Sequence, residues 1–222
     1  FKAALSFVKN KKIIGFINCP ISKENLFKKN YQGITEFLAK KSKSNGNETM
    51  LIYNKDLSVS PLTTHIPLNK VNKKIKKSNI VKKVKIINNF YKTVLNKKPS
   101  FGILGFNPHN FSPLKESNEE KIIERAVSNL KKLKIKATGP IATDSSFMNL
   151  KKKKYDVIVG MYHDQVLTPF KTIYKFDAIN ITLGLPYIRV SPDHGVAENI
   201  VGKNIGDSKS LIESIKFFNH IN

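Results

Sequence analysis

The sequence predicts an α/β layered fold. Short apolar runs of strand length alternate with segments in which apolar residues recur every three or four positions. A hydrophobic content of 40% is typical of a globular protein, and no stretch is long and apolar enough to cross a membrane. The 222 residues are enough for one large domain or two small ones.

Each element follows from its own local pattern. Apolar runs predict strands at 11–18, 49–54, 101–107, 155–160, 176–184 and 187–191. Helical spacing of apolar residues predicts helices at 22–27, 35–41, 80–94, 117–133 and 208–218. Ser117 and Glu120 have the spacing of a capping box, which predicts where the fourth helix begins.

The net charge of +23 raises the question of nucleic-acid binding. Among the 39 basic residues only Arg125 and Arg189 are arginine, although arginine is the residue that nucleic-acid interfaces prefer. Lysine, asparagine and isoleucine are abundant together, which favours a codon bias of an AT-rich genome. We expect no specific nucleic-acid partner and no membrane partner, and a catalytically silent polyanion-binding protein stays an alternative.

The single cysteine, Cys19, excludes an intramolecular disulfide and fits a reducing cytoplasm, where we expect the protein. The chain opens with FKAALSFVKN rather than with Met, as if inside a helix, and shows no signal peptide. We therefore expect a fragment or a processed chain.

Three of the five histidines follow predicted strands or strand-like stretches, namely His65, His109 and His163. Loops at the same end of aligned strands converge on one edge of a sheet, and three imidazoles there would make a metal site with open positions. Asn107 and Asp164 stand beside two of these histidines and could orient the rings. Ordinary hydrogen-bonded loop histidines are the alternative.

Arg189 lies among turn residues and apolar neighbours in LGLPYIRVSPDHG, where a planar guanidinium would suit a carboxylate or a phosphate. Lys171 and Asn180 flank the same region, so the three residues together predict a small phosphorylated substrate. Lys171 could equally be one of the many exposed lysines. Arg125 is expected on the solvated face of a helix, and neither a G-x-G-x-x-G nor a Walker A pattern is present.

Taken in order, TTHIPL, FNPH, GP followed by TD, MYHDQ, NITLGLPYIRVSPDHG and VGKNIGD resemble the 4-hydroxythreonine-4-phosphate dehydrogenase family. The resemblance implies an NAD-dependent enzyme of pyridoxal phosphate biosynthesis with a two-domain α/β/α fold similar to isocitrate and isopropylmalate dehydrogenases. The family is longer at its N-terminus. We therefore expect residues 1–30 to be the remainder of an N-terminal domain, 31–205 to bind metal and substrate, and 206–222 to be a helix returning to the first domain.

The resemblance also assigns roles to residues. It implies one divalent ion (zinc, magnesium or cobalt), shared across a homodimer interface by His65, His109 and His163. It implies substrate binding by Thr35, Lys171, Asn180 and Arg189. It places Asp144 and Asp164 near the metal, so that the expected catalytic residues are Lys171, Asp144 and Asp164. It implies NAD or NADP beside the loop of Asp193, His194 and Gly195.

Three positions depart from the family pattern. Ile34 stands where the family has a substrate-binding histidine, and Val166 and Val196 replace its usual Gly and Thr. The expected reaction is the oxidation and decarboxylation of 4-phosphohydroxy-L-threonine to 3-amino-2-oxopropyl phosphate. Because isoleucine cannot donate a hydrogen bond, a related four-carbon phosphorylated hydroxy acid stays an alternative substrate, and so does an impaired enzyme.

Overall fold

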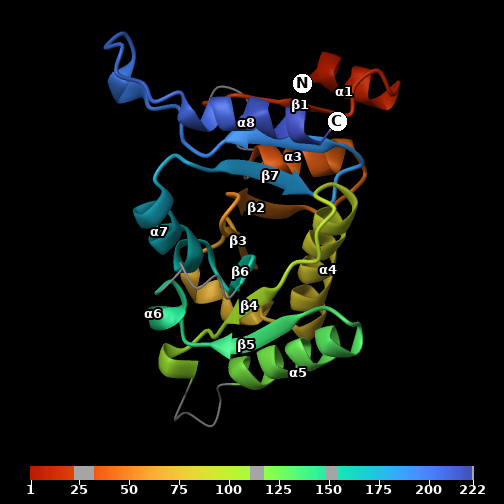
Figure 1. Cartoon of the computed structure of the whole chain (residues 1–222), viewed down its shortest axis with the longest axis vertical. Coiled ribbons are helices and arrows are strands. Elements are labelled where there is room, and N and C mark those ends of the chain that lie inside the picture. Colours follow the sequence, from red (N-terminus) through yellow and green to blue (C-terminus); the bar gives the residue numbers. More distant parts are fainter. Residues whose placement is uncertain (23–32, 111–117, 149–154, 222) are drawn as a thin grey trace. The chain divides into compact units, whose positions relative to one another are not determined.

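The computed structural model describes residues 1–22, 33–110, 118–148 and 155–221. They form two compact units, the first made of Phe1–Tyr53 and Tyr174–Asn222 and the second of Asn54–Ile173 (Figure 1). Within the first unit, the strand at Gly15–Ile17 pairs with the strand at Ile188–Pro192. The expected domain boundaries at 30 and 205 stay a prediction. The α/β class predicted from the sequence is confirmed.

The sheet of the first unit has the order β1, β8, β7, β2. Its strands are β1 (Gly15–Ile17), β8 (Ile188–Pro192), β7 (Ile179–Leu183) and β2 (Thr49–Tyr53). β1 runs parallel to β8, whereas β7 is antiparallel to both β8 and β2. Three of these strands lie within the stretches that the apolar runs predicted, and β8 extends one residue beyond its predicted stretch, 187–191.

Helices cover the two faces of this sheet differently. Thr182 of β7 is within 3.4 Å of Thr35 in α3 (Ile34–Lys41), so α3 covers the face that carries Thr182. Because strand residues alternate, Tyr53 belongs to the opposite face, where it meets Phe217 of α8 (Lys209–His220). The N-terminal helix α1 (Lys2–Lys9) buries no residue completely.

The sheet of the second unit is entirely parallel among its described strands. Their order is β3 (Ser58–Pro61), β6 (Val157–Gly160), β4 (Phe101–Leu104) and β5 (Ala137–Ile141). Every residue of β3, β4 and β6 is buried, which explains why β4 and β6 read as continuous apolar runs. The carboxyl ends of all four strands therefore lie at one edge.

Among the described residues, four α-helices belong chiefly to this unit: α4 (Lys77–Thr93), α5 (Glu119–Lys132), α6 (Thr143–Ser146) and α7 (His163–Tyr174). α4 and α5 lie where apolar periodicity predicted them. They pack on each other, and α5 also packs on β5 (Figure 1). The expected helix at 22–27 falls largely outside the described residues. No helix in the described ranges is long and apolar enough to span a membrane.

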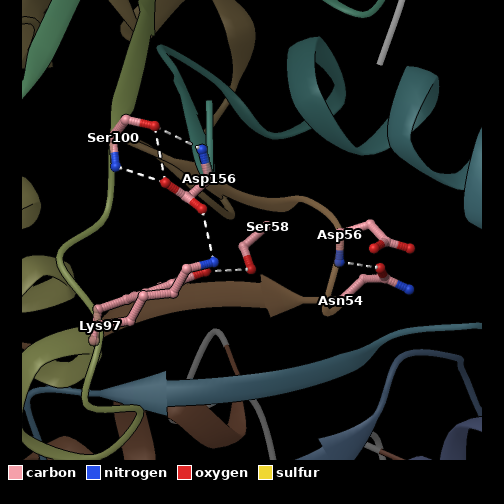
Figure 2. A network of polar contacts seen from close by, with 7 residues as sticks. Asn54, Asp56, Ser58, Lys97, Ser100 and Asp156 are labelled. Atoms are coloured by element: carbon pink, nitrogen blue, oxygen red, sulfur yellow. Dashed lines mark hydrogen bonds and ion pairs between the residues drawn. The ribbon is translucent and has the colours of Figure 1, made fainter. Parts of the chain in front are cut away.

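The amino-terminal edge of the same sheet is held by a polar network around Asp156 (Figure 2). The Asp156 carboxylate accepts hydrogen bonds from the backbone N–H and the hydroxyl of Ser100, both at 2.8 Å, and pairs with the Lys97 ammonium at 2.9 Å. Nearby, the Tyr91 hydroxyl of α4 donates to Ser58 of β3 at 2.8 Å. These contacts fix the strands at the edge opposite to their carboxyl ends.

Candidate metal and anion sites

The carboxyl ends of the parallel strands collect the predicted metal and acid residues. His65 follows β3, His109 follows β4 in a 3-10 turn, Asp144 follows β5 in α6, and His163 follows β6. In Figure 1 the arrowheads of β4 and β5 point towards α6. His163 was expected in a loop, but it is the first residue of α7. Helix geometry therefore sets its direction.

His65 and His163 form the first pair at this edge. Their ring centroids are 6.2 Å apart. In a tetrahedral site with zinc–nitrogen bonds of about 2.1 Å, the ring centroids of two histidine ligands lie roughly 5.3 Å apart, so these two rings would have to approach each other by about 1 Å to share one ion. Nδ1 of His163 lies 2.7 Å from the Asp164 carboxylate, which leaves Nε2 as the nitrogen for a metal. The pairing of Asp164 with a predicted ligand follows the expectation from the sequence.

His109 and Asp144 form the second pair. The His109 Nδ1 lies 3.5 Å from the Asp144 carboxylate, and the two side chains are 81% and 60% exposed. Within the described ranges, no three His, Cys, Asp or Glu side chains gather closely enough to hold an ion. A single chain thus brings His65 and His163 together and leaves His109, with its acid partner, as the third candidate ligand.

The backbone turns sharply at His109. His109 has φ 54° and ψ 19°, and Asn110 has φ 59°, so two successive residues are left-handed. With its amide nitrogen turned towards the Ile141 carbonyl, Asn110 bridges this carbonyl and the Ala142 N–H at 3.0 and 2.9 Å. A Cβ at Gly105 would come within 2.0 Å of the Asn110 side chain, so glycine leaves the space that this bridge needs.

Glu120 holds the start of the same loop. It was expected to close a capping box with Ser117, a residue outside the described ranges. Instead its carboxylate accepts hydrogen bonds from the Asn107 N–H at 2.8 Å, the Phe106 N–H at 3.2 Å and the Asn107 side-chain amide at 2.8 Å. Burial opposes ionisation, but these hydrogen bonds outweigh it and lower the pKa of Glu120. A negative charge on α5 therefore anchors the loop that carries His109.

Gln165 joins three of the strand ends. Its side-chain oxygen accepts from the Met161 N–H at 2.6 Å, and its nitrogen donates to the Gly105 carbonyl at 2.7 Å and to the Thr143 hydroxyl at 2.9 Å. The amide is buried. A Cβ at Gly160 would meet the side chains of Gln165 and Val166 at 3.0 and 2.6 Å, so glycine lets α7 start directly against the strand end.

Two other expected residues lie on α7. Lys171 is half-buried about two turns beyond His163, and its catalytic and substrate-binding roles stay predictions. Val166, one of the departures from the family pattern, is a fully buried core residue. Its change from glycine is therefore a change of packing. Val196, the other, is largely exposed.

The first unit contains a line of polar side chains centred on Arg189, which is only 3% exposed. Its Nε donates to the Asn18 side-chain oxygen at 2.7 Å, and its Nη1 donates to the Thr182 hydroxyl at 3.1 Å. The Thr182 hydroxyl is 3.4 Å from that of Thr35. Burial lowers the pKa of Arg189 to about 10, and Tyr187 offsets part of this effect.

Asn180 lies on the same face of the sheet as Thr182, because the two residues are separated by one position on β7. Its side-chain oxygen is buried without a hydrogen-bond partner among the described residues. An amide oxygen buried in this way is ready to accept a hydrogen bond from a ligand.

The expected cofactor loop begins where β8 ends. Asp193 is buried, and its N–H donates to the Ser210 hydroxyl of α8 at 2.8 Å. The His194 ring packs edge-on against Phe176 at a centroid distance of 6.1 Å. A Cβ at Gly195 would meet no atom within 4 Å, so space does not require a glycine there.

Comparison with known proteins decides the family. A family model described as "Pyridoxal phosphate biosynthetic protein PdxA" matches residues 1–218. The chain belongs to the PdxA family. A 4-hydroxythreonine-4-phosphate dehydrogenase of Sulfurihydrogenibium is 42% identical over 96% of the chain and 66% of its own length. One of Aquifex aeolicus is 40% identical over 92% of the chain and 64% of its own length.

Solved structures agree with this membership. A 4-hydroxythreonine-4-phosphate dehydrogenase of Klebsiella pneumoniae has a TM-score of 0.83 and 31% identity, covering 99% of this chain and 68% of that one. An isocitrate dehydrogenase of Methylococcus capsulatus has a TM-score of 0.61 at 10% identity, covering 98% and 71%, which shows a shared fold and confirms that expectation. The chain spans about two thirds of the length of the curated PdxA relatives.

The sequence did not reveal every residue that shapes these sites. Gln165 bonds to a carbonyl 60 positions away, Glu120 to an N–H 13 positions away, and Asn18 to a residue 171 positions away. Thr182 had a usable signal, because strand alternation places it on the face of Asn180. In this PdxA chain, the residues that shape the sites therefore include four that the sequence did not predict: Asn18, Thr182, Gln165 and Glu120.

Proposed function

We propose that the full-length protein is a metal-dependent, NAD- or NADP-linked dehydrogenase of pyridoxal phosphate biosynthesis. It oxidises 4-phosphohydroxy-L-threonine and releases carbon dioxide to give 3-amino-2-oxopropyl phosphate, and the coenzyme takes up the hydride. The observation that carries this proposal is the pairing of His65 with His163 at the carboxyl edge of a parallel sheet. Curated relatives of this name, 42% and 40% identical, support it.

The donor set fits a divalent ion. Imidazole nitrogens suit zinc and cobalt better than magnesium. Such an ion, when bound, lowers the pKa of a coordinated alcohol and stabilises the negative charge that develops on decarboxylation. The chain itself orients the ligands, because Asp164 and Asp144 each face the Nδ1 atom of a histidine. Asp164, Asp144 and Lys171 are the proposed acid–base residues.

A homodimer would complete the metal site. Two histidines of one chain are paired, whereas His109 is highly exposed beside Asp144. Each metal site would therefore take histidines from both chains of a symmetric dimer.

Substrate and coenzyme would be held by separate groups. Thr35, Asn180, Arg189 and Lys171 are the proposed substrate-binding residues, with the buried Arg189 as the anion partner. Asp193, His194 and Gly195 are the proposed residues for NAD or NADP. The exposed and unpaired Cys19 supports a reducing cytoplasm as the location.

Two observations support a second candidate substrate: the residue at position 34 and the name of one relative. Ile34 is the first residue of α3 and next to Thr35, so it replaces an imidazole beside a proposed substrate contact. An Oceanobacillus iheyensis relative, 33% identical over 96% of the chain, carries a provisional name as a D-threonate 4-phosphate dehydrogenase. A four-carbon phosphorylated hydroxy acid is therefore the second candidate substrate.

The test is coenzyme reduction by the full-length protein, followed at 340 nm (roughly the absorption maximum of reduced nicotinamide), with Zn²⁺, Co²⁺ or Mg²⁺. 4-Phosphohydroxy-L-threonine and D-threonate 4-phosphate are compared as substrates. Faster turnover of the threonine derivative supports the biosynthetic role, and faster turnover of the sugar acid supports the second candidate. A protein that only binds polyanions would reduce no coenzyme with either compound.

A further inference from the structure

Among the described residues, all hydrogen-bond partners of Arg189 are uncharged. Asn18 and Thr182 accept its two hydrogen bonds, at 2.7 and 3.1 Å. No Asp or Glu in the described ranges forms an ion pair with it. A guanidinium has five N–H groups, so the Nη2 group and one N–H of Nη1 have no partner in this part of the chain.

This arrangement is costly for an empty protein. A buried cation without a counter-charge loses its hydration and gains little in return. Aspartate at position 18 would keep the shape of the side chain and set a carboxylate oxygen against Nε at the present 2.7 Å. It would lose only the hydrogen bond that the Asn18 amide nitrogen donates to the Cys19 carbonyl at 3.0 Å, an exposed contact between neighbouring residues. The amide at position 18 therefore leaves the charge of Arg189 available.

The surroundings are suited to a second anion partner. Thr182 also approaches the hydroxyl of Thr35, which lies in the first turn of α3. The N-cap of α3, Gly33, makes no side-chain capping bond, so the partial positive charge at this helix end is not reduced by a cap. Asn180, with its unpartnered buried oxygen, shares the sheet face with Thr182.

We propose that Asn18 and Thr182 are positioning residues that fix the Arg189 guanidinium without neutralising it, so that an oxyanion of the substrate becomes its counter-ion. The inference rests on the proposed function, because a phosphorylated hydroxy acid supplies such an anion as phosphate or carboxylate. Because its hydrogen-bond partners are uncharged, Arg189 keeps its affinity for an anion, and the ligand-free protein is less stable as a result.

The decisive variant is Asn18→Asp in the full-length protein. Thermal unfolding is measured at low ionic strength, without ligand and with inorganic phosphate or acetate, and dissociation constants are derived from the ligand-induced shifts. Asn18→Asp should raise the midpoint of the ligand-free protein and weaken binding of the anion by about tenfold or more. The control Asn18→Leu removes the hydrogen-bond acceptor for Nε without adding a charge, so it should lower the midpoint and weaken binding less.

Thr182 gives an independent arm. Thr182→Val removes the acceptor for Nη1 and should weaken anion binding severalfold, whereas Thr182→Ser retains the hydroxyl and should bind as the wild type does. Protection by phosphate identifies the phosphate group as the counter-ion, and protection by acetate alone identifies the carboxylate. Wild-type affinity in Asn18→Asp, or no protection of the wild type by either anion, would overturn the proposal. Coenzyme reduction is measured separately, so a failure of the proposed reaction is distinguishable from a failure of this inference.

Discussion

Burial separates the two arginines of a lysine-rich chain. Arg189 is almost completely enclosed in β8, whereas Arg125 is exposed on α5, as the sequence predicted. An arginine held inside by neutral groups is a candidate for ligand binding, and an exposed arginine on a helix is ordinary surface. The two residues therefore form a natural pair of test and control.

Arg189→Lys should raise the KM for the phosphorylated substrate about tenfold to a hundredfold, with little change in metal affinity. The reason is that an ammonium replaces a planar fork poorly at a charged hydrogen bond worth about 1.5–3 kcal/mol. Steady-state kinetics and a metal titration measure the two effects. Arg125→Lys is the matched control and should behave as the wild type. Unchanged kinetics in Arg189→Lys would move the anion site elsewhere.

Ile34→His tests the position at which the chain departs from its family pattern. If 4-phosphohydroxy-L-threonine is the substrate, a restored imidazole should contribute about 1.5–3 kcal/mol of binding and raise kcat/KM about tenfold to a hundredfold. Ile34 is half-buried at the start of α3, so an imidazole at this position has access to solvent. The variant is assayed on both candidate substrates. No gain on the threonine derivative favours the four-carbon sugar acid.

At the scale of elements, the spacing of apolar residues predicted the helices and strands whose formation depends on local sequence. The apolar positions Ile80, Val84 and Ile87 are fully buried in α4, as their spacing indicated. α7 was missed because Pro169 lies inside it and its first turn is polar. β5 was missed because Gly139–Pro140 interrupts its apolar pattern. Tertiary contacts override both signals.

The site shows the same division. Strand ends predicted that three histidines would lie at one edge of a sheet, because parallel pairing follows from alternating strands and helices. No local pattern predicted the amide of Gln165 across three strand ends, nor the bond from Arg189 to Asn18. Such contacts depend on chain segments that meet only after folding.

Asp156→Asn tests the network at the amino-terminal strand edge. Burial opposes ionisation of Asp156, but Lys97 and Ser100 outweigh it and lower the pKa of the carboxyl. A lowered pKa contributes stability above the unfolded value of about 3.9, and this contribution is lost as the pH falls through the folded pKa. At pH 7 the free energy of unfolding of the variant should be about 1 kcal/mol lower than that of the wild type. This difference should shrink below about pH 4. Urea unfolding at several pH values between roughly 3 and 7 measures the free energy of unfolding of both proteins. A difference between them that is equal at every pH would contradict the prediction.

At the scale of the molecule, the two units carry different chemistry. The second unit holds the paired histidines and their acids, and the first holds the buried arginine with its neutral partners. A parallel sheet provides loops at one edge for the proposed metal ligands, whereas a mixed sheet provides a face on which polar side chains line up. The proposed reaction requires both sets of residues.

Mixing two inactive variants tests the shared metal site. His109→Ala and His163→Ala should each abolish metal-dependent turnover and leave the fold largely intact, because both side chains are at the surface edge of the sheet. If the ligands come from two chains, mixed dimers contain one site with both changes and one intact site. Co-refolding equal amounts should then restore about a quarter of wild-type activity. No recovery, with dimers confirmed by light scattering, would place all ligands in one chain.

The left-handed backbone of His109 bears on how metal selectivity could evolve in this fold. Aspartate and asparagine tolerate such a conformation about as well as histidine does, whereas β-branched residues do not. A single substitution to aspartate would therefore exchange a nitrogen donor for an oxygen donor without rebuilding the turn that Asn110 and Gly105 hold. Oxygen donors favour magnesium and manganese. In the proposed metal site, the geometry of one turn thus leaves a short mutational path from an ion held by imidazole nitrogens to magnesium or manganese.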